Sequence, residues 1–404
     1  MRAWPGVFCG LLIVSGVALA ASAQAEPSPD SQPAHDESRW FRNVRQLTSV
    51  DMGLDRSGEA YFSPDGKRIS FQAWPKGQQE YQIYVMNVDG TGLKMVSTGA
   101  GATTCSYFHP SGEKLIFAST HLDQRLPEKP AEVEPMRPRP AGDGEAHAGQ
   151  HPGGPPGSTP ASRPAGHPGA ELRPAGPPHG ASHPAGGSSA PNAWVYYPGM
   201  DIFEYTFATG ALRRLTSSDG YDAECAYSPD GKLIVFSSLR TGSQEIFICD
   251  ADGQNARQIT HAGGKNGGPF FSPDGQRVCY RSDRAGNDNL QVFVNNLAGT
   301  DERALTGNDT FNWCPFWHPS GKWLIFTQAG FRGRPNFDLY VIRDDGSEQH
   351  RVTSDPAFDG LPVFSPDGRY LMWTSRRGGL ESPQVFIAEF IGLTPAGELR
   401  AADR

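Results

Sequence analysis

The sequence predicts an all-β protein, a six-bladed β-propeller of four-stranded blades, and three observations support this prediction. An aromatic residue followed by a Ser/His-Pro-Asp/Ser-Gly turn recurs six times. Four of the five intervals between these motifs are 44 to 47 residues long. Each motif is followed by short segments of alternating apolar and polar residues, as in β-strands. Repeats of about 40–50 residues with four strands each are typical of propeller blades.

The turn at the start of each repeat has a clear physical basis. Proline presets the backbone for the second position of a turn, Asp or Ser favours the third, and glycine takes the position that needs a positive φ. The six motifs are Phe62–Gly66, Phe108–Gly112, Tyr227–Gly231, Phe271–Gly275, Trp317–Gly321 and Phe364–Gly368.

Three further strands complete each repeat. In the first repeat, Arg68–Gln72 and Gln82–Met86 both have strand character. Most repeats then contain a glycine turn and a short strand that ends in an aliphatic residue and threonine, such as Leu215-Thr216. With the strand that precedes the turn, this gives four strands per repeat.

The sixth repeat indicates how the ring closes. Its third strand is expected at Gln384–Phe390, and no clear fourth strand follows. The segment Val44–Thr48, which precedes the first repeat, ends in the same Leu-Thr signature. We therefore expect this N-terminal strand to complete the last blade and to remove an exposed sheet edge.

One interval, of 119 residues, is much longer than the others. It contains residues 122–199, in which 17 of 78 residues are proline and 13 are glycine. Large apolar residues are scarce there, so burial cannot offset the entropy of ordering. We predict a disordered insertion in blade 2, rich in Pro, Gly, Ala and His.

The ends of the chain predict export. Residues 1–25 resemble a signal peptide, with Arg2, a short apolar run and the small residues Ala23 and Ala25 at a cleavage site. A linker at 26–43, the propeller at 44–392 and a tail at 393–404 complete the expected organisation. We expect a periplasmic or secreted monomer without a membrane span, and the net charge of −8 gives no reason to expect nucleic-acid binding.

The strand before each turn should line the central channel, and two rings of residues follow from this. Six positions before the turn's first residue stand Ser57, Thr103, Asp222, Asn266, Asn312 and Asp359. Four positions before it stand Glu59, Cys105, Glu224, Gly268, Cys314 and Leu361. Because residues two apart on a strand face the same way, both rings are expected on the same side.

Oxygen ligands arranged in a ring suit a hard cation such as Ca²⁺. The predicted metal ligands are Asp222, Glu224 and Asp359. The alternative is that the Asp and Asn side chains cap the turns between blades through hydrogen bonds to the backbone.

The chain direction adds two residues to this channel mouth. The loop after the second strand of each blade lies on the side where the inner strand begins, and His121 and Arg240 lie in such loops. The 122–199 insertion should emerge there too. The predicted ligand-binding residues are Glu59, His121, Asp222, Glu224, Arg240, Asn312 and Asp359.

The motifs resemble a known family. The turns, the strand IYVMNVDGTG and the strand ends RRLT and RQIT are similar to the WD40-like repeats of TolB-family periplasmic propellers. The resemblance covers about 270 residues and implies a six-bladed propeller. An N-terminal α/β domain of the TolB type is not expected, because only about 18 residues separate the signal peptide from the ring.

Two functions stay open. The sequence contains no G-x-S-x-G, HExxH or P-loop motif. This favours an exported, non-enzymatic propeller that binds a protein or peptide at its channel mouth. The alternative is a metal-dependent carbohydrate lyase or hydrolase, or a peptidase-associated propeller, that acts at the same mouth.

Overall fold

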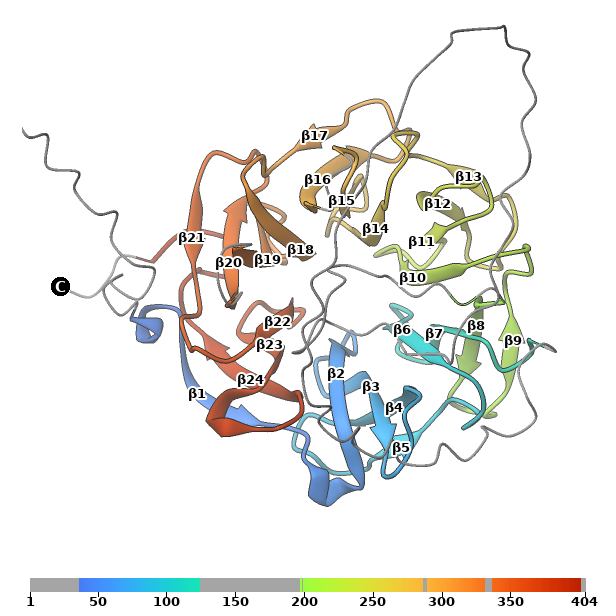
Figure 1. The fold of residues 1–404 in the computed structure, drawn as a ribbon, viewed down its shortest axis with the longest axis horizontal. Coiled ribbons are helices and arrows are strands. Elements are labelled where there is room, and N and C mark those ends of the chain that lie inside the picture. The colour runs from blue at the N-terminus through green and yellow to red at the C-terminus, as the bar shows by residue number, and fades with distance from the viewer. Residues whose placement is uncertain (1–35, 124–196, 198, 286–288, 331–335, 401–404) are drawn as a thin grey trace, which may run out of the picture. The chain divides into compact units, whose positions relative to one another are not determined.

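The structure, a computed structural model, describes residues 36–123, 197, 199–285, 289–330 and 336–400. The predicted signal peptide and nearly all of the predicted insertion lie outside these residues. Within them, six four-stranded antiparallel sheets are arranged around a centre (Figure 1). The predicted six-bladed β-propeller is therefore confirmed. No helix in the described part of the chain is long and apolar enough to cross a membrane.

The first three blades follow the chain in order, from the innermost strand outwards. Blade 1 consists of β2 (Leu54–Phe62), β3 (Arg68–Pro75), β4 (Gln82–Asn87) and β5 (Lys94–Met95). Blade 2 consists of β6 (Thr103–Phe108), β7 (Lys114–Ser119), β8 (Asp201–Thr206) and β9 (Leu212–Arg214). Blade 3 consists of β10 (Asp222–Tyr227), β11 (Leu233–Ser238), β12 (Glu245–Asp250) and β13 (Arg257–Gln258).

The last three blades include the closure of the ring. Blade 4 consists of β14 (Gly267–Phe271), β15 (Arg277–Ser282), β16 (Gln291–Asn296) and β17 (Arg303–Ala304). Blade 5 consists of β18 (Thr310–Trp317), β19 (Trp323–Gly330), β20 (Phe337–Arg343) and β21 (Gln349–Arg351). Blade 6 consists of β22 (Asp359–Phe364), β23 (Tyr370–Ser375), β24 (Gln384–Phe390) and the N-terminal β1 (Phe41–Gln46).

The turns between the first and second strands have the expected chemistry. In blade 1 the Ser63 hydroxyl donates to the Asp65 carboxylate (2.6 Å) and accepts from the Arg68 amide (2.9 Å). Gly66 closes the turn with a φ of 68°, and its amide donates to the Ser63 carbonyl. The equivalent glycines of the other five blades also have positive φ.

The signature of an aliphatic residue and threonine that ends most blades also has a physical role. In blade 2, the Thr216 hydroxyl accepts the amide of Ile202 on the third strand (3.0 Å). Thr48 does the same for Val385 (2.9 Å), although the two residues belong to opposite ends of the chain. The prediction that the N-terminal segment closes the ring is thus confirmed.

Apolar side chains fill the seams between neighbouring blades. One cluster joins blades 5 and 6 and includes the fully buried Trp323 and Trp373. Another joins blades 2 and 3 around Ile116 and Phe236. These seams hold the inner strands at fixed positions around the axis, and the candidate site is built on those strands.

Candidate functional site

Each inner strand contains a β-bulge at the same position. In blade 1, Gly58 pairs with Gln72 and Tyr61 pairs with Ser70, so two residues of β2 oppose one of β3. The register shifts at the equivalent point in the other five blades. The first residue of each bulge has a left-handed backbone, with φ between 48° and 61° at Glu59, Cys105, Glu224, Gly268, Cys314 and Leu361.

These six bulge residues are the ring that stands four positions before the turn. All six line one central cavity of about 60 Å³. The left-handed conformation costs a non-glycine residue about 1–2 kcal/mol. It recurs in every blade, so the fold imposes it, and it brings the bulge side chains to the cavity.

The second predicted ring lies elsewhere, which corrects the expectation that both rings face the same side. None of the six residues that stand six positions before the turn lines the cavity. All of them are at most 2% exposed. The bulge breaks the two-residue alternation on which that expectation was based.

The buried ring joins blades to one another. The Thr103 hydroxyl donates to the carbonyl of Tyr81 in the preceding blade (2.8 Å). The Asn266 amide donates in the same way to the carbonyl of Gln244 (3.0 Å). Side-chain bonds to the backbone between blades, the alternative considered from the sequence, therefore account for Thr103 and Asn266.

The two aspartates of this ring each pair with an arginine of their own blade. Asp222 accepts from Arg240 (2.9 Å), which lies against the Phe236 and Phe247 rings. Asp359 accepts from Arg377 (2.6 Å) and from the Trp373 indole.

The predicted metal ligands Asp222, Glu224 and Asp359 are not brought together. Glu224 lies in the cavity, and the two aspartates lie in separate seams. Among the described residues, no three His, Cys, Asp or Glu side chains are placed to share one ion.

His121 and Asn312 also lie away from the cavity. The His121 imidazole is hydrogen-bonded to Ser119 (2.8 Å), and its centroid lies 4.3 Å from that of Phe203. The Asn312 side chain bonds to Gln291 and Asn308 within the same seam. Of the seven predicted ligand-binding residues, Glu59 and Glu224 line the cavity.

Aromatic side chains fill the channel two positions further along the inner strands. The Tyr61 ring lies 5.5 Å from both Tyr107 and Phe270, and Phe270 lies 5.0 Å from Phe316. These four residues come from blades 1, 2, 4 and 5, so the contacts cross the axis. Three of them, Tyr61, Phe270 and Phe316, line the cavity together with the bulge residues.

One ion pair dominates the wall on the side of blades 3 and 4. Arg281 of β15 donates to Glu224 Oε1 (2.6 Å), and Arg281 is only 3% exposed. The other oxygen, Oε2, accepts from Ser237 (2.8 Å), Gln244 (3.3 Å) and the Gly268 amide (2.8 Å). Burial acts to raise the pKa of Glu224, but Arg281 outweighs it, so the pKa lies below its ordinary value. Glu224 is therefore an ionised and fully hydrogen-bonded carboxylate.

Two glycines make room for this ion pair. A Cβ at Gly267 would lie within 3 Å of both Glu224 Oε2 and the Arg281 guanidinium. A Cβ at Gly268 would lie 2.5 Å from Arg281 Nη1. Blade 4 thus has glycine where other blades have Glu, Cys or Leu, because the guanidinium occupies that volume.

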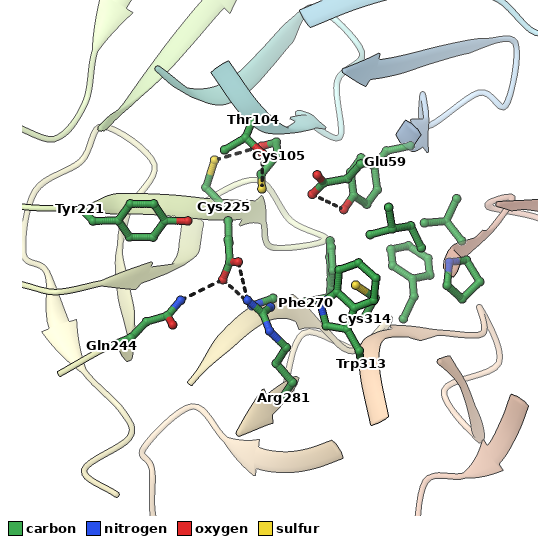
Figure 2. Close-up of a pocket in the computed structure, with 17 residues that line it drawn as sticks. Glu59, Thr104, Cys105, Tyr221, Cys225, Gln244, Phe270, Arg281, Trp313 and Cys314 are labelled. Atoms are coloured by element: carbon green, nitrogen blue, oxygen red, sulfur yellow. Dashed lines mark hydrogen bonds and ion pairs between the residues drawn. The ribbon is translucent and has the colours of Figure 1, made fainter. Parts of the chain in front are cut away.

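Glu59 is the second carboxylate of the cavity, and its surroundings differ. Its Oε1 accepts from the Tyr61 hydroxyl at 3.3 Å, and its backbone amide donates to Thr374 of blade 6. Burial raises the pKa of Glu59 to about 7, and the charge of Glu224 adds to the shift. Figure 2 shows Glu59 and Arg281 approaching the cavity from different sides. They come from blades 1 and 4, which lie opposite each other in the ring.

Three cysteines line the cavity, and Cys105, Cys225 and Cys314 are all neutral thiols because burial raises the pKa of each. Burial raises the pKa of Cys105 and of Cys314 well above the ordinary value. The nearby Glu59 and Glu224 charges add to both shifts. All three are free cysteines, and the Cys105 sulfur lies 3.1 Å from the Thr104 hydroxyl. None of them is a thiolate nucleophile at neutral pH, because a thiol reacts as its anion.

Several cavity residues were missed from the sequence, above all Arg281. The sequence nevertheless contains a signal that could have identified Arg281. The equivalent positions in the other second strands carry small or uncharged residues, namely Gln72, Ala118, Ser237, Thr327 and Thr374. A lone arginine there, opposite a Gly-Gly pair, indicates a buried cation that needs both space and a carboxylate.

Comparisons with known proteins agree with this architecture. Residues 193–334 match the family described as TolB beta propeller domain. An uncharacterized protein of Agrobacterium fabrum is 38% identical over 61 residues, which is 15% of this chain and 21% of that protein. The match thus spans about a fifth of the length of that relative.

Two solved structures are similar over most of the chain. A candidate TolB from Agrobacterium tumefaciens superposes with a TM-score of 0.51 at 16% identity, covering 83% of this chain and 90% of that one. TolB from Acinetobacter baumannii gives 0.50 at 15% identity, covering 85% of this chain and 65% of that one. At such identities the likeness concerns the fold. Repeat motifs, blade topology and the family match agree, and the chain carries a TolB-like six-bladed β-propeller.

Proposed function

We propose that the protein is an exported, non-enzymatic propeller that binds a peptide segment of a protein partner at its channel mouth. The observation that carries this proposal is the central cavity, which is lined on one side by the aromatic rings of Tyr61, Phe270 and Phe316. In this proposal the ligand enters from the side where the inner strands begin, opposite these rings. Export rests on the predicted signal peptide at residues 1–25.

The size and lining of the cavity favour binding of one side chain. A volume of about 60 Å³ holds about five water-sized groups. Its walls are mostly apolar, with Trp313, Phe316 and Leu361 beside the charged groups. Apolar walls with a few placed polar groups are typical of specific recognition sites.

The chemistry of the polar groups also favours binding over catalysis. The three cavity thiols stay protonated, and Ser237, Gly268 and Arg281 hold the Glu224 carboxylate in place. Such groups position a ligand, but they do not supply a reactive nucleophile.

A cavity-filling substitution tests the proposal. The purified full-length chain is used to select peptides from a displayed random library. Selected peptides should bind wild type and Cys314→Ser, but they should bind Cys314→Leu at least tenfold more weakly. Leucine is compatible with this backbone, because Leu361 has a φ of 56° at the equivalent position of blade 6, against 52° at Cys314.

Three outcomes would overturn the proposal. The proposal is wrong if the library yields no peptide. It is also wrong if the selected peptides bind Cys314→Leu as well as wild type, because their site then lies outside the cavity. Cleavage of peptides or oligosaccharides by wild type, with loss of that activity in Cys314→Leu, would instead assign an enzymatic function to the mouth.

A further inference from the structure

We propose that the cavity receives a primary ammonium group on an unbranched methylene chain, with Glu59 as its counter-ion. In the proposed function, on which this inference rests, the group is a lysine side chain of the bound peptide. The argument comes from the unequal pairing of the two cavity carboxylates.

The charges in the cavity do not balance. Glu224 and Arg281 form a contact ion pair, and each cancels the other. The Glu59 carboxylate accepts a long hydrogen bond from Tyr61, and the nearby Cys105 thiol acts to lower its pKa. When Glu59 ionises, the cavity has a net charge of −1 and no described cation pairs with it directly.

The groups facing Glu59 come from several strands and point to the same conclusion. Tyr61 lies on the same strand, Cys105 on β6, and Glu224 on β10. Arg281 on β15 lowers the pKa of Glu59, but its influence is smaller than those of burial, Cys105, Glu224 and Tyr61. A buried carboxylate with so little compensation attracts a cation that can enter.

The remaining lining suits a lysine side chain. Trp313, Phe316 and Tyr61 offer aromatic faces, which attract a cation within about 6 Å. Leu361, Pro362 and Val363 form an apolar wall that can cover a methylene stem. The cavity holds about five water-sized groups, which matches four methylenes and one nitrogen.

The protonation of Glu59 makes such binding depend on pH. Burial raises the pKa of Glu59 to about 7, so the fraction ionised increases from about a tenth at pH 6 to about nine tenths at pH 8. A ligand that binds only the ionised form gains affinity in proportion to that fraction. An alkylammonium stays charged over this range. Affinity should therefore increase about tenfold from pH 6 to pH 8.

The probe is n-butylammonium chloride, and n-butanol serves as the uncharged isostere. Binding to the full-length chain is measured by calorimetry at pH 6 and pH 8, at constant ionic strength. We expect butylammonium to bind wild type about tenfold more tightly at pH 8, whereas n-butanol should show no such change. Glu59→Gln should bind butylammonium at least tenfold more weakly at pH 8.

The matched control is Glu80→Gln. Burial also raises the pKa of Glu80 to about 7, but Glu80 does not line the cavity. Glu80→Gln should bind butylammonium like wild type. The inference is wrong if butylammonium binds no better than n-butanol at pH 8, or if Glu59→Gln and wild type bind it equally.

The outcomes separate this inference from the proposed function. If butylammonium binds through Glu59 but the library yields no peptide, the ammonium site stands and the peptide-binding function fails. If selected peptides occupy the cavity but bind equally well when each lysine is replaced by norleucine, the peptide-binding function stands and the ammonium site is wrong.

Discussion

Glu37, just before the first strand, forms a two-pronged ion pair with Arg377 of the last blade. Arg377 Nη1 lies 2.7 Å from Glu37 Oε2, and Nη2 lies 2.8 Å from Oε1. The same guanidinium binds Asp359 at 2.6 Å. The ion pair joins residues 340 positions apart, beside the strand pair β1–β24 that closes the ring.

The first prediction concerns this closure. Burial acts to raise the pKa of Glu37, but the hydrogen bonds from Arg377 outweigh it and hold the pKa below its ordinary value. Glu37 therefore adds stability that is present above its unfolded pKa of about 4.5 and is lost as the pH falls. Glu37→Gln should lower the free energy of unfolding at pH 7 by about 1–3 kcal/mol.

Urea unfolding at pH 7 measures this change. Glu389→Gln is the control, because the Arg42–Glu389 pair lies on the same strand pair but is exposed. That substitution should change the free energy of unfolding much less than Glu37→Gln does, because solvent screens an exposed pair. Equal effects of the two substitutions would show that Glu37 does not stabilise the closure.

The second prediction concerns the pH dependence of stability. The folded pKa of Glu59, about 7, lies above its unfolded value. The protonated form is thus favoured in the folded state, and stability is lost as the pH rises from about 4.5 to about 7. Glu59→Gln removes this loss and should stabilise the protein at pH 8 by about 1–3 kcal/mol more than at pH 5.

Urea denaturation of both proteins at pH 5 and pH 8 gives the comparison. Glu59→Gln keeps the left-handed backbone and the side-chain length, so packing is matched. A stability difference between the two proteins that does not change with pH would mean that Glu59 titrates near its ordinary pKa in the folded state.

The third prediction concerns the glycine beside the ion pair. A Cβ at Gly267 would lie 2.4 Å from Glu224 Oε2 and 2.7 Å from Arg281 Nη2. Gly267→Ala should displace the pair and destabilise the fold by about 1–3 kcal/mol. Gly307→Ala is the control, because nothing lies within 4 Å of its Cβ position. Similar thermal unfolding of both variants would refute a steric role for Gly267.

The fourth prediction concerns the Glu224–Arg281 pair itself. Arg281→Met leaves Glu224 buried with its remaining neutral donors and should cost about 3–5 kcal/mol. The double variant Glu224→Gln/Arg281→Met should lose much less stability than the two single variants added together. A double-mutant cycle by guanidinium denaturation measures this coupling. Additive effects would show that the two charges do not depend on each other.

Much of the fold could be predicted because its determinants are local. The turn between the first two strands depends on Ser63, Asp65 and Gly66, which lie within four residues. The closing strand could be recognised because Thr48 ends a segment with the same signature as Thr216. Such signals recur in each blade and depend little on the rest of the chain.

The candidate site could be predicted only in part. Glu59 and Glu224 were predicted because residues four positions before the turn do line the cavity. Asp222, Asp359 and Asn312, which stand six positions before the turn, are buried in the seams instead. The bulge decides between the two rings. Glu, Cys and Leu do not favour a left-handed backbone, so these residues do not indicate a bulge. The break in the two-residue alternation could therefore not be predicted from the sequence.

By itself, the sequence determined the number of blades, their turns and the way the ring closes. These follow from short-range turn chemistry and from a repeated apolar pattern. The tertiary structure alone decided which polar residues face the axis. Six bulges rotate one residue of each blade into a shared cavity, and the ring brings Glu59, Glu224 and Arg281 together from blades 1, 3 and 4. Their charges and pKa values then depend on burial and on neighbours distant in the chain, which only the assembled ring supplies.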